Sequence, residues 1–303
     1  MQQAPEERLQ RARQSLAGLS VGDAFGECFF GRVDIILGVI ATRTLPTPPW
    51  TYTDDTQMAL SLYALLRASD PLDQERLAQS FAVRYERWRG YGAAMHAVFQ
   101  RLRQGEPWPE VACGLFEGEG SFGNGAAMRV APLGAYYADD LDRAVGEAIR
   151  SAEVTHAHPD GIAGAIAVAV AAGVACRLAR ERTRPRPAAF LRLLLSFVPP
   201  GAVHDGLRHA STLPEGTSVQ QAVRALGNGT EVSAQDTVPF ALWCAATHLD
   251  SFEEAMWWTV SGLGDRDTTC AMVGGVVAAY TGSAGIPPSW LAWREPLPAW
   301  AVG

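Results

Sequence analysis

Apolar residues recur every three or four positions along most of this 303-residue chain, which is the spacing of one face of an α-helix. Stretches in which apolar and polar residues alternate are nearly absent, and 33 to 40 (VDIILGVI) is the only fair candidate for a strand. The pattern therefore predicts an all-α fold with proline- and glycine-rich turns. Helices are expected at 7–19, 56–68, 73–88, 91–103, 140–152, 161–181, 186–197, 217–226, 236–248, 251–261 and 268–281.

The spacing of the turns bears on domain organisation. None of the turns is long enough to link two domains, and no repeat of fixed period is present, so we expect 1–303 to form a single compact orthogonal bundle of helices. The uncharged run at 161 to 176 is shorter than the roughly 20 residues that span a bilayer, which predicts a buried helix and no membrane association. The polar N-terminus lacks the apolar segment of a signal peptide.

Composition narrows the classes of function. A net charge of −7 argues against a nucleic acid as the main partner. The chain contains no lysine, which excludes Schiff-base and P-loop chemistry. Its cysteines are scattered singly, which favours reduced thiols in a cytoplasmic protein. We also expect a monomer. The cysteines are Cys28, Cys113, Cys176, Cys244 and Cys270.

Two acidic clusters stand at the start of otherwise apolar segments. They are YTDDTQMAL, which contains Asp54 and Asp55, and GDRDTTCAM, which contains Asp265 and Asp267. Each cluster alone is better explained as a helix cap, with acids placed against the positive end of the helix dipole. Together their carboxylates and threonine hydroxyls are hard ligands suited to Mg²⁺ or Mn²⁺. Spacing alone does not establish that the two clusters meet.

A glycine-rich stretch, GSFGNGAAMRVAPLG at 120 to 134, is a second candidate site. Its glycines allow positive φ and let backbone N–H groups converge on an anion, although such a stretch is often only a turn. The run that follows predicts a helix whose N-terminus would also favour a phosphate. Arg129 could pair with the acids, with a phosphate or in a structural salt bridge.

Two histidines precede the predicted buried helix in THAHPDGIAGA, residues 155 to 165. A zinc site would need further histidine or cysteine ligands at suitable spacing, which the sequence does not provide. Hydrogen bonding to a substrate or helix capping is the favoured interpretation of His156 and His158.

Taken in order, these motifs resemble those of the ADP-ribosylglycohydrolase family. The matching stretches are GLSVGDAFGE, YTDDTQMAL, GSFGNGAAMRVAPLG, THAHPDGIAGA and GDRDTTCAMVGGVVAAYTG, which cover about residues 15 to 282. That family includes the dinitrogenase-reductase-activating glycohydrolases and the ADP-ribosyl-acceptor hydrolases. The resemblance implies an all-α fold with two Mg²⁺ or Mn²⁺ ions in a central cleft, and hydrolysis of the bond between ADP-ribose and an acceptor.

The resemblance also implies roles for single residues. The implied metal ligands are Thr53, Asp54, Asp55, Asp265, Asp267 and Thr268, and we take Asp54, Asp55 and Asp267 as catalytic. The implied substrate-binding residues are Ser121, Phe122, Gly123, Asn124, Gly125, Ala126, Met128 and His156. Among these residues, the 121 to 126 loop would hold the diphosphate and His156 would lie near the adenosine-side ribose.

Two departures from the family pattern concern the acceptor. Family members that cleave serine linkages carry a glutamate where this chain has Phe30, and Glu27 lies one helical turn earlier. Bacterial arginine-type members place an aspartate within the stretch that corresponds to 88 to 99, where this chain has no carboxylate. We favour an arginine-linked substrate on a protein or small-molecule conjugate. A serine-linked or small-molecule ADP-ribose derivative is the alternative substrate.

Two other classes of function stay open. One is a catalytically silent homologue that binds ADP-ribose or serves as a crystallin-like structural protein. The other is a two-metal phosphoesterase, because acid-rich two-metal sites also suit phosphoryl chemistry. The products separate these classes, because only the hydrolase releases free ADP-ribose.

Overall fold

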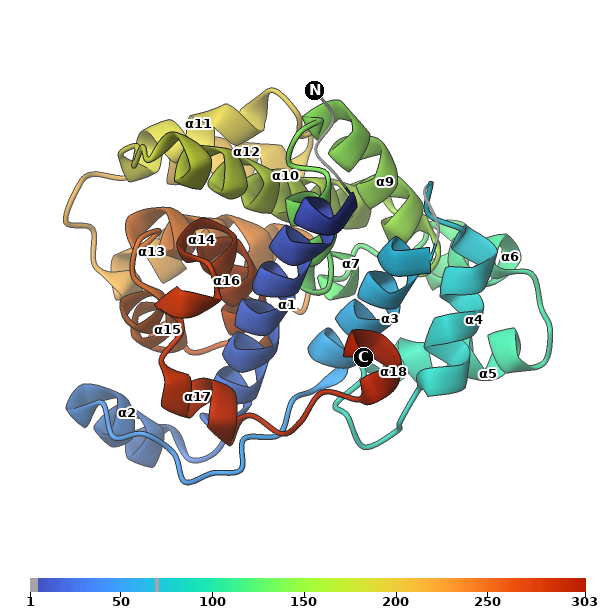
Figure 1. The fold of residues 1–303 in the computed structure, drawn as a ribbon, viewed down its shortest axis with the longest axis horizontal. Helices are drawn as coiled ribbons and strands as arrows, with labels where there is room; N and C mark the ends of the chain where they lie inside the picture. The colour runs from blue at the N-terminus through green and yellow to red at the C-terminus, as the bar shows by residue number, and fades with distance from the viewer. Residues whose placement is uncertain (1–4, 69–70) are drawn as a thin grey trace.

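The structure, a computed structural model, describes residues 5–68 and 71–303 and confirms the all-α prediction (Figure 1). Each helix expected from the apolar spacing is present. Within the described residues no strand forms, and only two isolated bridges pair Trp50 with Arg294 and Gly123 with Ser233. The helices are α1 (Pro5–Glu27), α2 (Val33–Thr42), α3 (Asp54–Ala68), α4 (Gln74–Arg84), α5 (Ala93–Arg103), α6 (Trp108–Cys113), α7 (Gly125–Met128), α8 (Ala131–Tyr136), α9 (Leu141–Glu153), α10 (Pro159–Glu181), α11 (Pro187–Leu195), α12 (Ala202–Ala210), α13 (Val219–Leu226), α14 (Ala234–Thr247), α15 (Phe252–Val260), α16 (Arg266–Thr281), α17 (Pro288–Trp293) and α18 (Ala299–Val302), with 3₁₀ turns η1 (Phe116–Gly118) and η2 (Ser283–Gly285).

The strand predicted at 33–40 is wrong, because this segment is α2. The helix ends at Arg43, which adopts a left-handed conformation (φ 50°) and donates its N–H to Ile40 O. Short apolar runs fit a strand or a helix equally well, and here no neighbouring strand offers backbone partners. The helix lies at the lower left of Figure 1 and keeps its apolar side chains at 33, 35 and 37 exposed.

Helix α1 crosses the middle of the molecule, between α16 and α3 (Figure 1). The backbones of α1 and α16 touch, because a Cβ on Gly22 would lie 2.1 Å from Cys270 O and one on Gly26 would lie 2.2 Å from Arg266 O. Glycine is therefore required at both positions. The contact fixes the first turn of α16 against the last turns of α1.

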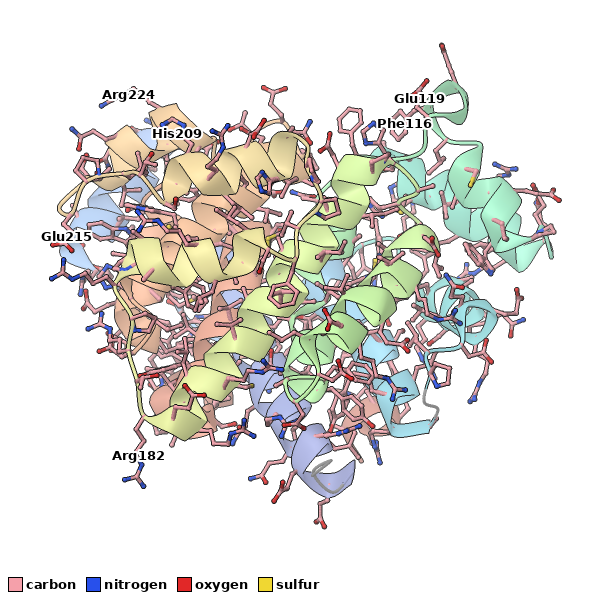
Figure 2. The ribbon with its side chains drawn as sticks, turned by 90° about the horizontal axis from the view of Figure 1, so that it is seen from above. Phe116, Glu119, Arg182, His209, Glu215 and Arg224 are labelled. Carbon is pink, nitrogen blue, oxygen red and sulfur yellow. The ribbon has the colours of Figure 1, made fainter. Side chains whose placement is uncertain are left out.

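Helix α10 passes through the interior, as predicted for the apolar run at 161 to 176. It has 23 residues and is apolar enough to cross a membrane by length and composition, but 83% of its most apolar window is buried in the protein. Its C-terminal end lies at Arg182, and its other end lies beside the loop that carries Phe116 (Figure 2). The buried apolar side chains of the helices form one cluster around it. The organisation of 1–303 as a single domain stays a prediction.

Candidate functional site

The first acidic cluster begins α3 and is buried. Asp54 and Asp55 occupy the first turn, with 8% and 1% of their surface exposed. The Asp54 N–H donates to Arg89 O at 2.8 Å, which ties the start of the helix to the loop before α5. The side chain of Thr53 donates either to Asp23 at 2.8 Å or to Asp55 at 3.0 Å. Burial of two adjacent carboxylates goes well beyond what a helix cap requires.

Asp23 of α1 belongs to this site, although the sequence analysis gave it no role. The carboxylate is fully buried and accepts the backbone N–H groups of Thr53 and Thr56, both at 3.0 Å. It also accepts their hydroxyls, at 2.8 Å from Thr53 and 2.6 Å from Thr56. Through these bonds to both of its oxygens, Asp23 orients the start of α3 and the ligand candidates there. The signal was present in the motif GLSVGDAFGE.

The second acidic cluster begins α16 and meets the first. The Thr268 hydroxyl lies 3.5 Å from Asp55 Oδ2, across 213 residues of sequence. Carboxylate oxygens of Asp23, Asp55 and Asp267 lie within 4.8 Å of one another. The structure therefore brings together the two halves that the sequence left separate.

Among the described residues, no cationic side chain forms an ion pair with the carboxylates of this cluster. Burial, reinforced by neighbouring carboxylates, raises the pKa of Asp54, Asp55 and Asp267 well above the usual range. One oxygen each of Asp55 and Asp267 is buried without a hydrogen-bond partner. Arg266 turns its guanidinium away and donates to Phe29 O at 2.8 Å. An all-oxygen donor set with buried, unpartnered carboxylate oxygens fits divalent Mg²⁺ or Mn²⁺.

A cleft of about 640 Å³ opens above these carboxylates. Of the predicted metal ligands, Asp54, Asp265, Asp267 and Thr268 line it, whereas Thr53 and Asp55 are not part of its lining. All predicted substrate-binding residues line it except Ala126, whose side chain is buried. The remaining lining residues were not indicated by the sequence, and they are Met58, Gly90, Gly92, Ala93, Ala94, Met95, Phe116, Glu231 and Val232.

In the glycine-rich loop, glycine is required mainly because the backbone packs closely against neighbouring residues. Only Gly120 has the positive φ (76°) that we expected of three glycines. A Cβ on Gly123 would lie 3.2 Å from His156 Nε2, and one on Gly125 would lie 3.0 Å from the same atom. Among the described residues, the N–H groups of Gly125 and Ala126 have no acceptor. The loop can therefore offer backbone donors beside the imidazole.

Asn124 connects this loop to the acidic cluster. Its side-chain amide donates to Asp265 Oδ2 at 2.7 Å and to Thr237 Oγ1 at 3.1 Å. Its backbone N–H donates to Val232 O at 3.2 Å. The loop and the metal-ligand candidates are therefore held in a fixed relation.

Aromatic rings form the rim of the cleft. Phe116 and Phe122 stack with centroids 6.3 Å apart, and both rings are partly exposed. Figure 2 shows Phe116 at the edge of the molecule, above the start of α10. His158 packs edge-on against Phe122 and caps α10 by accepting the Asp160 N–H at 3.1 Å. Of the two histidines, His156 lines the cleft and His158 is a cap.

Arg129 pairs with no carboxylate among the described residues, so the pairing with the acids and the structural salt bridge considered for it are wrong. Pairing with a phosphate stays a prediction. It is fully buried and donates to Ser151 O at 2.7 Å and Thr155 Oγ1 at 2.9 Å. Its guanidinium also lies 4.6 Å from the centre of the Phe81 ring. Burial lowers its pKa to about 9. It lies behind the glycine-rich loop and bonds Gly125 O at 3.2 Å.

The cleft lining contains neither Phe30, which stands in place of the family's glutamate, nor Glu27, one helical turn earlier. It does contain Gly90 and Gly92, from the stretch in which the family's aspartate is missing. Phe30 packs under the guanidinium of Arg266, 4.4 Å from ring centre to Cζ, and is 44% exposed. Glu27 ends α1, and partial desolvation of its carboxyl group, followed by the charge of Asp23, raises its pKa. Neither residue reaches the cleft in this structure.

We expect Asp23→Asn to weaken metal binding about 10–100-fold, as for other residues that orient ligands. An amide cannot accept the four donors of Thr53 and Thr56, so the start of α3 loses its anchor. Titration with Mn²⁺ measures the effect. Asp34→Asn, at an exposed residue paired with Arg32, is the control and should not change the affinity. Unchanged affinity in Asp23→Asn would show that this carboxylate does not orient the site.

Comparisons with known proteins agree with this geometry. The family model for ADP-ribosylglycohydrolase matches residues 4–300. The chain is 31% identical to ADP-ribosylhydrolase ARH3 of Homo sapiens, over 93% of this chain and 88% of the relative. It is 26% identical to ADP-ribosylarginine hydrolase Tri1 of Pseudomonas putida, over 96% of this chain and 76% of that protein. A solved structure described as an ADP-ribosylglycohydrolase-related protein complex superposes with a TM-score of 0.59 at 25% identity, covering 96% of this chain and 94% of the other.

Proposed function

Because this chain belongs to the ADP-ribosylglycohydrolase family, we propose that it is a metal-dependent hydrolase that removes ADP-ribose from an acceptor, with ADP-ribosylated arginine preferred. Water adds at the C1″ carbon of the distal ribose, the bond to the acceptor breaks, and free ADP-ribose and the acceptor leave. The observation that carries the proposal is the meeting of a buried and a partly buried acidic cluster in a cleft that also contains the glycine-rich loop.

The proposed metal ligands supply oxygens only. Thr53, Asp54 and Asp55 come from the start of α3, and Asp265, Asp267 and Thr268 come from the start of α16. We propose two Mg²⁺ or Mn²⁺ ions here, because several buried carboxylates repel one another unless cations neutralise them. Bound divalent ions supply a water of lowered pKa and hold ribose hydroxyls.

The remaining residues of the cleft suit an ADP-ribose ligand. The loop from Ser121 to Gly125 offers backbone N–H groups for the diphosphate, and His156 lies beside them. The rings of Phe116 and Phe122 at the rim offer flat apolar surface for a purine base. A glycosidic bond that breaks with oxocarbenium character develops positive charge at C1″, which the carboxylates of Asp54, Asp55 and Asp267 stabilise.

The charge of the cleft supports a cationic acceptor. Asp54, Asp265 and Asp267 in its lining are proposed metal ligands, which leaves Glu231 as the acid that no proposed ion neutralises. Among the described residues, no arginine lines the cleft. A guanidinium is therefore attracted, whereas nothing in the lining favours an anionic acceptor. Phe30 also stands in place of the glutamate that serine-linkage members carry, which further favours arginine. We propose that the protein acts as a cytoplasmic monomer on modified proteins or small conjugates, without a membrane or nucleic-acid partner.

A panel of ADP-ribosylated arginine peptide, serine peptide and a small-molecule conjugate tests the proposal. With Mn²⁺ present we expect free ADP-ribose and unmodified arginine peptide, identified by mass spectrometry. Release from the serine peptide alone would reverse the acceptor assignment. Formation of AMP or phosphate would instead identify a phosphoesterase, and absence of turnover with intact ADP-ribose binding would identify a silent homologue.

Gly123→Val should raise KM for the modified peptide or Kd for ADP-ribose at least about tenfold, equivalent to about 1.4 kcal/mol. The added side chain enters the space beside His156 Nε2 and Ser121 Oγ, both 3.2 Å from the Cβ position. Calorimetric titration with ADP-ribose measures the loss. Gly146→Ala, where an added Cβ meets nothing within 4 Å, is the matched control. Metal affinity should stay unchanged in both variants. Equal ADP-ribose affinity in both would contradict the assignment of the glycine-rich loop as the diphosphate-binding loop.

A further inference from the structure

A buried chain of three polar side chains ends at the cleft. Arg129 Nη2 donates to Thr155 Oγ1 at 2.9 Å, and Thr155 Oγ1 lies 2.7 Å from His156 Nδ1. Arg129 and Thr155 are fully buried, and His156 is 4% exposed. Arg129 is fixed in turn by Ser151 O and Gly125 O. The Nδ1 atom of the His156 imidazole is therefore hydrogen-bonded inside the protein.

The direction of these hydrogen bonds follows from the chemistry of the groups. A guanidinium only donates, so Thr155 Oγ1 must accept from Arg129. The threonine hydroxyl then needs an acceptor for its own proton, and His156 Nδ1 is the acceptor that the described residues provide. A proton on Nδ1 would leave this buried hydroxyl proton unpartnered, which costs about 1–3 kcal/mol. Nδ1 is therefore the unprotonated nitrogen, and the ring proton sits on Nε2.

The Nε2 atom is on the cleft side of the ring. It lies against the backbone of Gly123 and Gly125, and among the described residues it makes no hydrogen bond. We infer that Arg129 and Thr155 are positioning residues that hold His156 as the Nε2–H tautomer, so that it donates one hydrogen bond to a phosphate or hydroxyl oxygen of the ligand. The inference rests on the proposed function only for the identity of that ligand.

Burial and the nearby guanidinium support this state. Together they lower the pKa of His156 to about 3, with burial the larger cause. The ring is therefore neutral at physiological pH. A neutral imidazole carries a proton on only one of its two nitrogens. The arginine thus has two effects, since its charge keeps the ring neutral and its hydrogen bond selects the tautomer.

Long-range ¹H–¹⁵N NMR of histidine-labelled protein tests the inference directly. The signals of His156 are identified as those that disappear in His156→Gln. In the wild-type protein we expect a protonated Nε2 and an unprotonated Nδ1, before any ligand is added. A protonated Nδ1 would overturn the inference. This readout needs neither turnover nor ADP-ribose, so it stands even if the proposed function fails.

Two substitutions at Thr155 then test its consequence for binding. Thr155→Val keeps the shape but removes the hydroxyl, and it should shift the tautomer signals and weaken ADP-ribose binding about tenfold. Thr155→Ser restores the hydroxyl and should bind within about twofold of wild type. Thr259→Val removes another buried hydroxyl, which bonds Ala255 O away from the cleft, and controls for stability. Unchanged tautomer signals in a folded Thr155→Val protein would contradict the proposal that Arg129 and Thr155 position His156.

Discussion

Asp267→Asn should reduce turnover of an ADP-ribosylated substrate more than about 100-fold, beyond the cost of removing a residue that only orients a ligand. The carboxylate lies in the first turn of α16, and its Oδ1 is buried without a hydrogen-bond partner. An amide has the same shape, but it lacks the charge and places an NH₂ group where a cation needs an oxygen. Single-turnover release of ADP-ribose measures the loss. Circular dichroism should show unchanged helix content.

The matched control for this substitution is Asp142→Asn. Asp142 also lies in the first turn of a helix, α9, but is exposed. If Asp267 acted only against the helix dipole, the two substitutions would have similar small effects of about 0.3–1 kcal/mol on stability and none on turnover. Turnover that survives in Asp267→Asn would therefore indicate that the acidic cluster only caps the helix.

Removal of divalent metal should lower both activity and thermal stability. Metal that binds only the folded state at 100 times its Kd stabilises the protein by about 2.7 kcal/mol. For a chain of 303 residues, that corresponds to a melting temperature higher by roughly 4 °C. Thermal unfolding with a chelator, and then with Mg²⁺ or Mn²⁺ restored, measures the difference. The metal affinity should fall as the pH is lowered, because protons compete for the same carboxylates.

The Asp267→Asn protein is also the control for the chelation experiment. Its melting temperature should respond little to chelator or to added metal, because one of the carboxylates that binds the ion is lost. An equal response in both proteins would place the metal at some other site. Paired anomalous peaks from crystals soaked in Mn²⁺ would give the number of ions.

The sequence predicted the long helices correctly because apolar spacing reports burial on one side. The same reasoning failed at α2. Its apolar residues are largely exposed, so their spacing does not mark a buried helix face. It also missed α12, as well as several helices of four to six residues, and the latter are too short to show a period. The run after the glycine-rich loop was expected as one helix, but it breaks at Arg129 and Val130 into α7 and α8.

The candidate site was predictable as far as its residues carry a visible pattern. Paired aspartates beside threonines were conspicuous in the sequence, and both clusters lie at the cleft. Asp23 was not conspicuous, because α1 contains several acids and the sequence gives no indication of which donors each of them meets. The partners of Arg129 could not be deduced either, because they are two backbone carbonyls and one hydroxyl brought together by tertiary packing.

The wide separation of the two acidic clusters in the chain has a consequence for the order of folding. Asp55 and Thr268 meet across 213 residues, and α1 must already lie between their helices for the contact to form. Contacts between such distant segments form late, after the entropy of closing a long loop has been overcome. Metal coordination should therefore follow the assembly of α1, α3 and α16 rather than nucleate it. Capture of Mn²⁺ during refolding would then report the arrival of the nearly complete native chain.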